Sequence, residues 1–288
     1  MILVTGATGL VGRPLVELLV SSGMSVRAVS RAPQAARLPA GVEVVQGDPS
    51  QPMSIATALH GVTGVVLNPR AVGTAAEELL AIARKQGVRR VVALSALNVD
   101  FDLARQPSRM RGAYNKEVEA AAVSSGLEWT SLRSGWYAAN SIGMWAEQIR
   151  RGTVVRSAHA AGSWAPLHEA DIAAVAGRAL MTDDLVGRMP VLTGPRSMTL
   201  PEMVTTIGTV IGRPLRFQEV AHADAVRELV AVGIPEPAAE GFMALQADSY
   251  GQRDLVTGAV EKILGRPGLS FADWVGAHVD AFTLNSPT

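Results

Sequence analysis

The chain has 288 residues, 48% of them hydrophobic, and its 26 basic and 26 acidic side chains cancel to a formal net charge of zero. Balanced charge argues against a nucleic-acid partner, and the absence of cysteine excludes disulfides, thiolate metal sites and a cysteine nucleophile. No apolar run reaches membrane-spanning length and the N-terminus lacks a signal-peptide pattern, so we expect a cytoplasmic globular protein without a membrane partner.

The N-terminal stretch carries the pattern around which the rest of the chain is organised. Residues 2–4 form a short apolar run that predicts a buried strand, and residues 15–20 carry an apolar helix pattern. Between them, Gly6 lets the backbone turn sharply, Gly9 leaves room for a pyrophosphate, and Gly12 lets helix and strand pack closely. A glycine triplet alone also occurs in hairpins and loops, but strand, turn and helix in this order favour a dinucleotide site.

The predicted helix supplies the positive charge that phosphates need. Its first N–H groups are free, and its N-terminus carries the positive end of the helix dipole. We therefore predict that the turn contacts a cofactor through Gly6, Thr8, Gly9, Leu10, Val11 and Gly12.

A second predicted strand, residues 25–30, ends at Arg31, where an NAD site is expected to carry an Asp or Glu for the ribose 2′-hydroxyl. No carboxylate lies near Arg31 in the sequence, and a guanidinium can bind a 2′-phosphate through paired charge-assisted hydrogen bonds. Arg31 therefore predicts NADP(H) rather than NAD(H), the alternative being a solvated loop arginine. Arg13, in the first helical turn, either assists or is a surface residue.

Three further apolar runs predict strands at residues 42–47, 64–67 and 90–96, with helices between them. This alternation implies an α/β protein with a doubly wound parallel sheet, whose ligands lie at the carboxyl ends of the strands. Asp48 can accept a hydrogen bond from the adenine amino group, or cap a helix that starts near Ser54. The residues predicted to face the cofactor from these ends are Gly6, Arg31, Asp48, Asn68 and Ser95.

The pattern is less regular beyond a sixth predicted strand at residues 129–133. Helix is expected at residues 111–125, 144–150 and 169–181, a short strand at 191–192, a capping box at Thr199 that opens a helix to Ile211, a strand at 216–220, and mostly helix over 223–282.

Motifs spread over most of the chain resemble the NmrA-like branch of the atypical short-chain dehydrogenases, which includes type 2 quinone oxidoreductases. They are residues 5–12, Arg31, 47–48, Lys116 with Glu119, 125–127, 130–133, Asn140, 171–174, 192–194 and 211–214. The resemblance implies a Rossmann-type sheet with a smaller, mainly helical C-terminal substrate lobe. It assigns residues 1–135 and about 165–194 to the NADP(H)-binding domain, and residues 136–164 and 195–288 to the lobe.

Short-chain dehydrogenases normally carry Tyr-x-x-x-Lys, whose spacing places both side chains on one helix face. Here the residue four before Lys116 is Gly112, and Tyr114 is only two before it. We therefore predict that the usual dyad cannot form. The resemblance implies that Lys116 reaches the nicotinamide ribose and the substrate carbonyl, where its ammonium can stabilise a developing oxyanion. The alternative is a solvated helix lysine.

Two hydroxyl groups are candidate partners of Lys116 in catalysis. Ser95 can donate to the same substrate oxygen, although small residues at strand ends often only pack. The resemblance places Tyr137 in the nicotinamide pocket, where it is a candidate proton donor or part of an apolar wall beside Trp136. His168 is titratable, but we favour a structural role for it.

The loop at residues 135–140, with Met144 and Trp145, predicts apolar contacts around a single amide, Asn140. A mostly apolar pocket with few polar anchors suits a flat hydrophobic or aromatic substrate. The alternative is that these side chains are core residues.

Two functions compete. The first is an NADPH-dependent oxidoreductase that reduces a hydrophobic carbonyl, quinone or related electrophile by hydride transfer. The second is a non-catalytic NADP(H)-binding redox sensor, since the family's fold leaves function open. Epimerase or dehydratase chemistry on nucleotide sugars is a distant third because it relies on the dyad. No metal-ligand cluster is predicted, and the protein is expected to be a monomer or homodimer.

Overall fold

The computed structural model describes residues 1–249 and 251–283, which divide into two units. The first unit contains Met1–Asp100, Gly112–Ser134 and Glu169–Leu192. The second unit contains Phe101–Arg111, Gly135–His168 and the chain from Thr193 onward. Within the described residues, no helix is long and apolar enough to cross a membrane.

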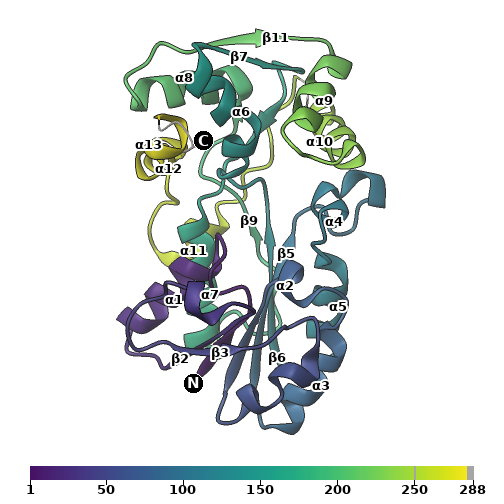
Figure 1. Cartoon of the computed structure of the whole chain (residues 1–288), viewed down its shortest axis with the longest axis vertical. Helices are drawn as coiled ribbons and strands as arrows, with labels where there is room; N and C mark the ends of the chain where they lie inside the picture. Colours follow the sequence, from purple (N-terminus) through teal and green to yellow (C-terminus); the bar gives the residue numbers. More distant parts are fainter. Residues whose placement is uncertain (250, 284–288) are drawn as a thin grey trace. The chain divides into compact units, whose positions relative to one another are not determined.

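A seven-stranded parallel sheet forms the centre of the first unit, as the sequence predicts (Figure 1). Its order is β3-β2-β1-β4-β5-β6-β9, so the chain runs outward from β1 to β3 and then returns to β4 beside β1. This reversal is the switch point at which doubly wound sheets bind ligands. The strands are β1 (Ile2–Val4), β2 (Val26–Ser30), β3 (Glu43–Gln46), β4 (Gly64–Leu67), β5 (Arg90–Ala96), β6 (Glu128–Ser134) and β9 (Val191–Leu192).

Helices cover both faces of this sheet (Figure 1). One face carries α1 (Gly12–Ser21) and α7 (Glu169–Met181), and the other carries α2 (Pro69–Val72), α3 (Ala76–Lys85) and α5 (Asn115–Ser124). The central strands β1 and β4 are fully buried, which is why their sequences are continuous apolar runs. The helix expected near Ser54 is instead a pair of 3₁₀ turns, Pro52–Ile55 and Thr57–Leu59.

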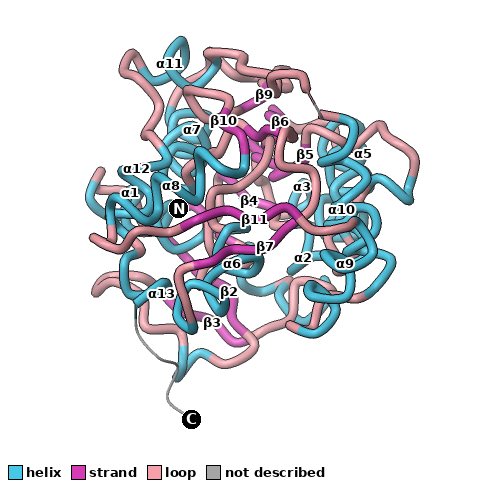
Figure 2. Tube along the Cα trace, turned by 90° about the horizontal axis from the view of Figure 1, so that it is seen from above, coloured by secondary structure: helices cyan, strands magenta, loops and turns pink. Residues whose placement is uncertain are grey.

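The second unit contains two small sheets. β7 (Val154–Ser157) pairs in parallel with β11 (Arg216–Glu219), and β8 (Ser163–Trp164) pairs antiparallel with β10 (Met198–Thr199). Figure 2 shows β7 and β11 side by side, with α6 next to β7. The helices are α4 (Pro107–Met110), α6 (Asn140–Arg151), α8 (Leu200–Val210), α9 (His222–Ala231), α10 (Glu236–Asp248), α11 (Ala259–Leu264), α12 (Phe271–Ala277) and α13 (Val279–Thr283), with a 3₁₀ turn at Leu103–Arg105.

Aromatic side chains fill the core of the second unit. Trp145, Trp274 and Phe282 are among its largest fully buried side chains, and the Trp274 ring stacks on Phe271 with their centroids 5.7 Å apart. The predicted capping box is present, because Thr199 and Glu202 bond each other's backbone N–H groups at the start of α8.

Residues 101–111 group with the second unit, whereas the sequence-based domain limits place them in the first. The reason is their packing on α10. A Cβ added at Gly241 of α10 would lie only 2.5 Å from the carbonyl oxygen of Ala104, so the two backbones are in close contact. An ion pair between Arg105 and Asp248 adds a second link between these segments.

Candidate cofactor site

The glycine-rich turn between β1 and α1 is built as its spacing predicts. Gly6 has φ = +64°, a backbone conformation that favours glycine. A Cβ at Gly12 would lie 2.1 Å from the carbonyl oxygen of Gly6, so any side chain there would force α1 away from the turn. A Cβ at Gly9 would lie 3.1 Å from the same oxygen. The turn therefore exposes bare main chain directly before the helix.

The N-terminus of α1 lacks a side-chain cap. Val11 occupies the N-cap position without a capping hydrogen bond, and the first turn contains no acidic residue. Among the described residues, no backbone carbonyl accepts the N–H groups of Leu10 or Val11. Free N–H groups at the positive end of a helix dipole form an anion site. This end of the first unit can therefore hold a phosphate group.

A cavity of about 330 Å³ opens in the first unit beside this turn. Four of the predicted cofactor residues line it, namely Gly6, Thr8, Arg31 and Asp48. The remainder of its wall is Val29, Ser30, Ala32, Ala35, Ala36, Pro49, Ser50, Arg70 and Ala71. The cavity thus lies at the carboxyl ends of β1, β2 and β3, as a doubly wound sheet requires.

Arg31 is an exposed cation of this cavity. Its guanidinium forms no hydrogen bond or salt bridge with any described residue, although its charge acts on the Asp48 carboxylate. Arg13 behaves differently, because its guanidinium donates to the backbone oxygens of Arg37 at 2.6 Å and Ala36 at 3.4 Å. Arg13 therefore holds the loop after β2 against α1, and Arg31 is left available for an anionic ligand.

Asp48 holds its own turn rather than capping a helix. Its carboxylate accepts the Oγ–H of Ser50 at 2.7 Å and the N–H of Ser50 at 3.0 Å. These two hydrogen bonds hold the pKa of Asp48 below its ordinary value, so the side chain is ionised at neutral pH. A third hydrogen bond in this turn runs from the backbone N–H of Asp48 to Ser54 Oγ at 3.0 Å. Asp48 lines the cavity, and the contact of its carboxylate with adenine stays a prediction.

Asn68 links the two strands of the switch point. Its backbone N–H donates to Thr5 Oγ1 at 2.8 Å, and its Oδ1 caps α2 by accepting the N–H groups of Arg70 and Ala71. A Cβ at Gly6 would lie 2.9 Å from the Asn68 side chain, so the side chain lies directly against the turn. Its structural role is thus visible, and its contact with the cofactor stays a prediction.

Arg70 lines the cavity but is not among the cofactor residues predicted from the sequence. It belongs to the first turn of α2, directly after Asn68 and Pro69, and it is exposed. Its position after a strand end is the signal that could have found it. The cavity therefore has two arginines and one carboxylate in its wall.

Ser95 lies at the end of β5 with its hydroxyl buried next to Glu119. The residue is 3% exposed, and its hydroxyl reaches no partner with hydrogen-bond geometry in the described residues. Burial opposes ionisation of Glu119, but the guanidinium of Arg133 and the hydroxyls of Ser131 and Ser95 hold the pKa of Glu119 below its ordinary value. Ser131 Oγ donates to this carboxylate at 2.6 Å, and Arg133 Nη2 donates to it at 2.5 Å. The catalytic role of Ser95 stays a prediction.

Lys116 is the second residue of α5, because this helix begins at Asn115 and not at residue 111 as predicted. Gly112 has φ = +84° and Tyr114 is the N-cap residue, so both precede the helix and the helical-face argument does not apply to them. Lys116 is exposed and forms no ion pair within the described residues. A cation in the first turn opposes the helix dipole, a local conflict typical of functional positions.

The remaining candidates belong to the second unit. Tyr137 is half-buried, and its carbonyl accepts the N–H of Asn140 at 2.9 Å where α6 begins. Met144 and Trp145 are 8% and 1% exposed and belong to the hydrophobic core, which was the alternative to a substrate pocket. His168 is buried directly before α7. No group of three or more metal-ligating side chains is found in residues 1–249 and 251–283.

Comparison with known proteins decides the family. The NAD(P)H-binding family model matches residues 6–183, which is more than half of the chain. The chain belongs to the NAD(P)H-binding family. The resemblance to the NmrA-like atypical short-chain dehydrogenases is confirmed by relatives and solved structures of the quinone oxidoreductase type.

Three relatives match over nearly their whole length. The (4-alkanoyl-5-oxo-2,5-dihydrofuran-3-yl)methyl phosphate reductase of Streptomyces griseus is 36% identical, covering 98% of this chain and 99% of the relative. The NAD(P)H azoreductase of Xenophilus azovorans is 30% identical with coverage of 98% and 99%. Quinone oxidoreductase 2 of Escherichia coli is 27% identical with coverage of 96% and 97%.

A solved structure agrees with these matches. The Escherichia coli NADPH-dependent quinone oxidoreductase complexed with NADPH has a TM-score of 0.79 and 26% identity, with coverage of 97% of this chain and 99% of that one. The expected Rossmann-type fold is therefore confirmed, and the expected NAD(P)H-dependent oxidoreductase is confirmed at the level of the family.

Proposed function

We propose that this protein is an NADPH-dependent reductase that delivers a hydride to a small, mostly apolar electrophile. The observation that carries the proposal is the cavity of the first unit, in which the Arg31 guanidinium is exposed and forms no hydrogen bond or ion pair with a described residue. A guanidinium in that state binds a phosphate with paired charge-assisted hydrogen bonds. Arg31 would thus hold the 2′-phosphate that distinguishes NADPH from NADH.

The rest of the cofactor fits the turn. The free N–H groups of Leu10 and Val11 would hold the pyrophosphate, and the absence of side chains at Gly9 and Gly12 allows its close approach. When bound, the cofactor supplies the hydride. Support also comes from the similar quinone oxidoreductase whose crystal structure contains NADPH.

The substrate class follows from what the relatives share. Their names describe reduction of an unsaturated acyl lactone phosphate, an azo compound and a quinone. Each is a conjugated acceptor in which an oxygen or nitrogen can take up negative charge. We therefore propose a conjugated carbonyl, quinone or azo compound as the substrate of this protein.

Lys116 would stabilise the charge that develops on that substrate. Its ammonium and the N-terminus of α5 are both positive, and positive charge at the reacting oxygen or nitrogen lowers the barrier to hydride addition. Tyr137 would return a proton. Ser95 would assist only if its hydroxyl turned away from Glu119.

The test is whether the purified protein oxidises NADPH when a quinone, an azo dye or an acyl-substituted unsaturated lactone is supplied as the acceptor. The absorbance of the reduced nicotinamide monitors the reaction. We expect turnover with at least one acceptor. Lys116→Met should lower kcat about 100-fold, with a smaller loss of NADPH affinity from its contact with the nicotinamide ribose. The matched control is Lys85→Met, on the exposed last turn of α3, which should keep the wild-type rate. Tight NADPH binding with no oxidation by any acceptor would contradict the reductase and favour the redox sensor.

A further inference from the structure

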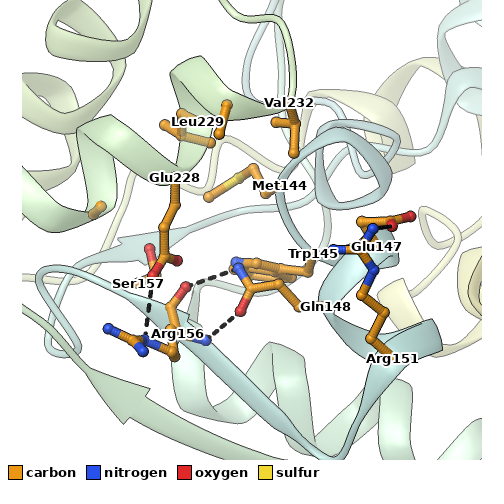
Figure 3. A pocket seen from close by; sticks show the side chains of 12 residues that line it. Met144, Trp145, Glu147, Gln148, Arg151, Arg156, Ser157, Glu228, Leu229 and Val232 are labelled. Atoms are coloured by element: carbon orange, nitrogen blue, oxygen red, sulfur yellow. Dashed lines mark hydrogen bonds and ion pairs between the residues drawn. The ribbon is translucent and has the colours of Figure 1, made fainter.

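The second unit has a cavity of its own, with a volume of about 250 Å³, between α6, β7 and α9 (Figure 3). It is separate from the cofactor cavity, with which it shares no residue. One wall, α9, lies beyond the part of the chain that matches the NAD(P)H-binding family. Its lining residues are Met144, Trp145, Glu147, Gln148, Arg151, Arg156, Ser157, Ala225, Glu228, Leu229, Ala231 and Val232.

The interior of this cavity is apolar. Met144, Leu229 and Val232 lie on one side in Figure 3, and the flat ring of Trp145 lies on the other. Pockets for drug-sized ligands measure ~300–1,000 Å³, so this smaller cavity suits a molecule with a single ring. A ring between thioether, branched aliphatic and indole surfaces gains both burial and aromatic contact.

The cavity wall contains one hydroxyl, that of Ser157. Ser157 is 4% exposed and lines the cavity, and no described residue hydrogen bonds its hydroxyl, which is not among the fully buried polar atoms without a partner. The indole Nε1–H of Trp145 is instead enclosed by the protein. A bound molecule that offers an acceptor would gain from pairing with the Ser157 hydroxyl.

The charged residues at the edge of the cavity are already paired. Arg156 Nε lies 3.2 Å from Glu228 Oε1, and Arg151 Nη2 lies 2.7 Å from Glu147 Oε1. The Gln148 side chain bonds the backbone of Arg156 at both ends, with its Nε2 donating at 3.1 Å and its Oε1 accepting at 2.7 Å. No unpaired charge among these residues would attract an ion, so the fitting ligand is neutral.

We propose that this cavity is a second ligand site, which binds a small neutral aromatic or conjugated molecule that carries a hydrogen-bond acceptor. The apolar walls hold the ring, and the acceptor pairs with the Ser157 hydroxyl. The site does not depend on the reductase activity proposed above, because none of its residues takes part in that proposal.

The probe is acetophenone, a neutral ring with a carbonyl acceptor. Ethylbenzene has nearly the same shape without the acceptor, and benzoate carries a charge. Each is titrated into ¹⁵N-labelled full-length protein saturated with NADPH, and the indole N–H resonances are followed. The resonance of Trp145 is assigned from its loss in Trp145→Phe. If that variant does not fold, it is assigned by elimination from single Phe variants of the other four tryptophans, Trp129, Trp136, Trp164 and Trp274.

We expect acetophenone to shift the Trp145 indole resonance and to bind at least about fivefold more tightly than ethylbenzene, with benzoate having no effect. Trp136 and Trp164 provide a matched internal control, because their indole N–H groups are also buried without acceptors but do not line this cavity. Their resonances should stay in place. Ser157→Ala should weaken the binding of acetophenone and leave the binding of ethylbenzene unchanged.

Three results would overturn the proposal. They are no shift of the Trp145 resonance at saturating acetophenone, equal shifts of the Trp136, Trp145 and Trp164 resonances, and equal affinity for acetophenone and ethylbenzene. The first would show that the cavity does not bind such a ring, the second that binding is unspecific, and the third that no acceptor is recognised.

Discussion

The two cavities of this protein are built by opposite means. In the first unit, the wall is made of turns that follow parallel strands, of bare main chain, and of Arg31, which has no hydrogen-bond or ion-pair partner among the described residues. In the second unit, the wall is made of side chains from two helices and a strand, and its charges are paired. The first cavity therefore owes its chemistry to topology and backbone, and the second owes it to packing. Substitutions should reveal this difference.

The backbone of the glycine-rich turn is tested at Gly12. Because Gly12→Ala would place a Cβ 2.1 Å from the carbonyl oxygen of Gly6, the start of α1 must move. Such overpacking costs about 1–3 kcal/mol, and we expect NADPH affinity to fall about tenfold or more in a calorimetric titration. The matched control is Gly143→Ala on α6, where the added Cβ meets nothing within 4 Å. Unchanged NADPH affinity in Gly12→Ala would show that the backbone of the turn does not set the site.

Glu119 tests the support behind the strand ends of the first unit. Glu119→Gln removes a charge that accepts bonds from Ser131 and Arg133, and we expect urea unfolding to lose about 1–3 kcal/mol of stability near neutral pH. Glu17→Gln, on the exposed face of α1, is the control and should change little.

The pH dependence of that difference has a definite sign. The pKa of Glu119 is lowered in the fold, so its contribution is present above the ordinary carboxyl value of 4.5 and is lost as pH falls through the folded pKa. Wild type and Glu119→Gln should therefore converge in stability on acidification below that value. A difference that stays constant would contradict the ionised pair.

A histidine pair tests the second unit and gives a smaller effect. His159 Nε2 lies 3.0 Å from His222 Nδ1, and His222 Nε2 lies 2.9 Å from Glu240 Oε2. Burial and the neighbouring His222 lower the pKa of His159, and the charge of Glu219 opposes this only in part. The neutral ring is therefore the form that the fold favours.

The contribution of neutral His159 is present above its ordinary pKa of 6.5 and is lost as pH falls through that value toward the lowered folded pKa. We expect the melting temperature of the wild type to fall more between about pH 8 and about pH 5.5 than that of His159→Asn. Asparagine suits this position because His159 has φ = +55°. His60→Asn, on an exposed turn of the first unit, should keep the wild-type slope. Equal slopes for all three proteins would exclude the effect.

The sequence predicted the first unit well because its signals are local. Continuous apolar runs indicate β4 and β5, and the spacing of Gly6 and Gly12 predicts a turn whose close contact the structure shows. The predicted start of α5 was wrong because a propensity pattern does not reveal that Gly112 adopts a positive φ. Arg70, in the first turn of α2, was not predicted although it follows a strand end, because only the folded chain shows that it lines the cavity.

The second cavity could not be predicted from the sequence. Its walls come from α6, β7 and α9, and no local pattern states that these segments lie together. Met144 and Trp145 fit a helical pattern whether they face a core or a ligand. The structure shows that both side chains belong to the hydrophobic core and also line this cavity. Likewise, the sequence shows Ser95 as a hydroxyl near the end of a predicted strand, but it does not show that the buried carboxylate of Glu119 lies beside it.

The central claim is that Arg31 selects the cofactor, and calorimetric titration of NADPH and NADH tests it most directly. Wild type should bind NADPH more tightly, and Arg31→Ala should lose about 10- to 100-fold in NADPH affinity while NADH affinity changes little. Arg188→Ala, at an exposed position of the same unit, should match wild type with both dinucleotides. Equal losses for NADPH and NADH in Arg31→Ala, or no affinity of the wild type for either dinucleotide, would contradict the account.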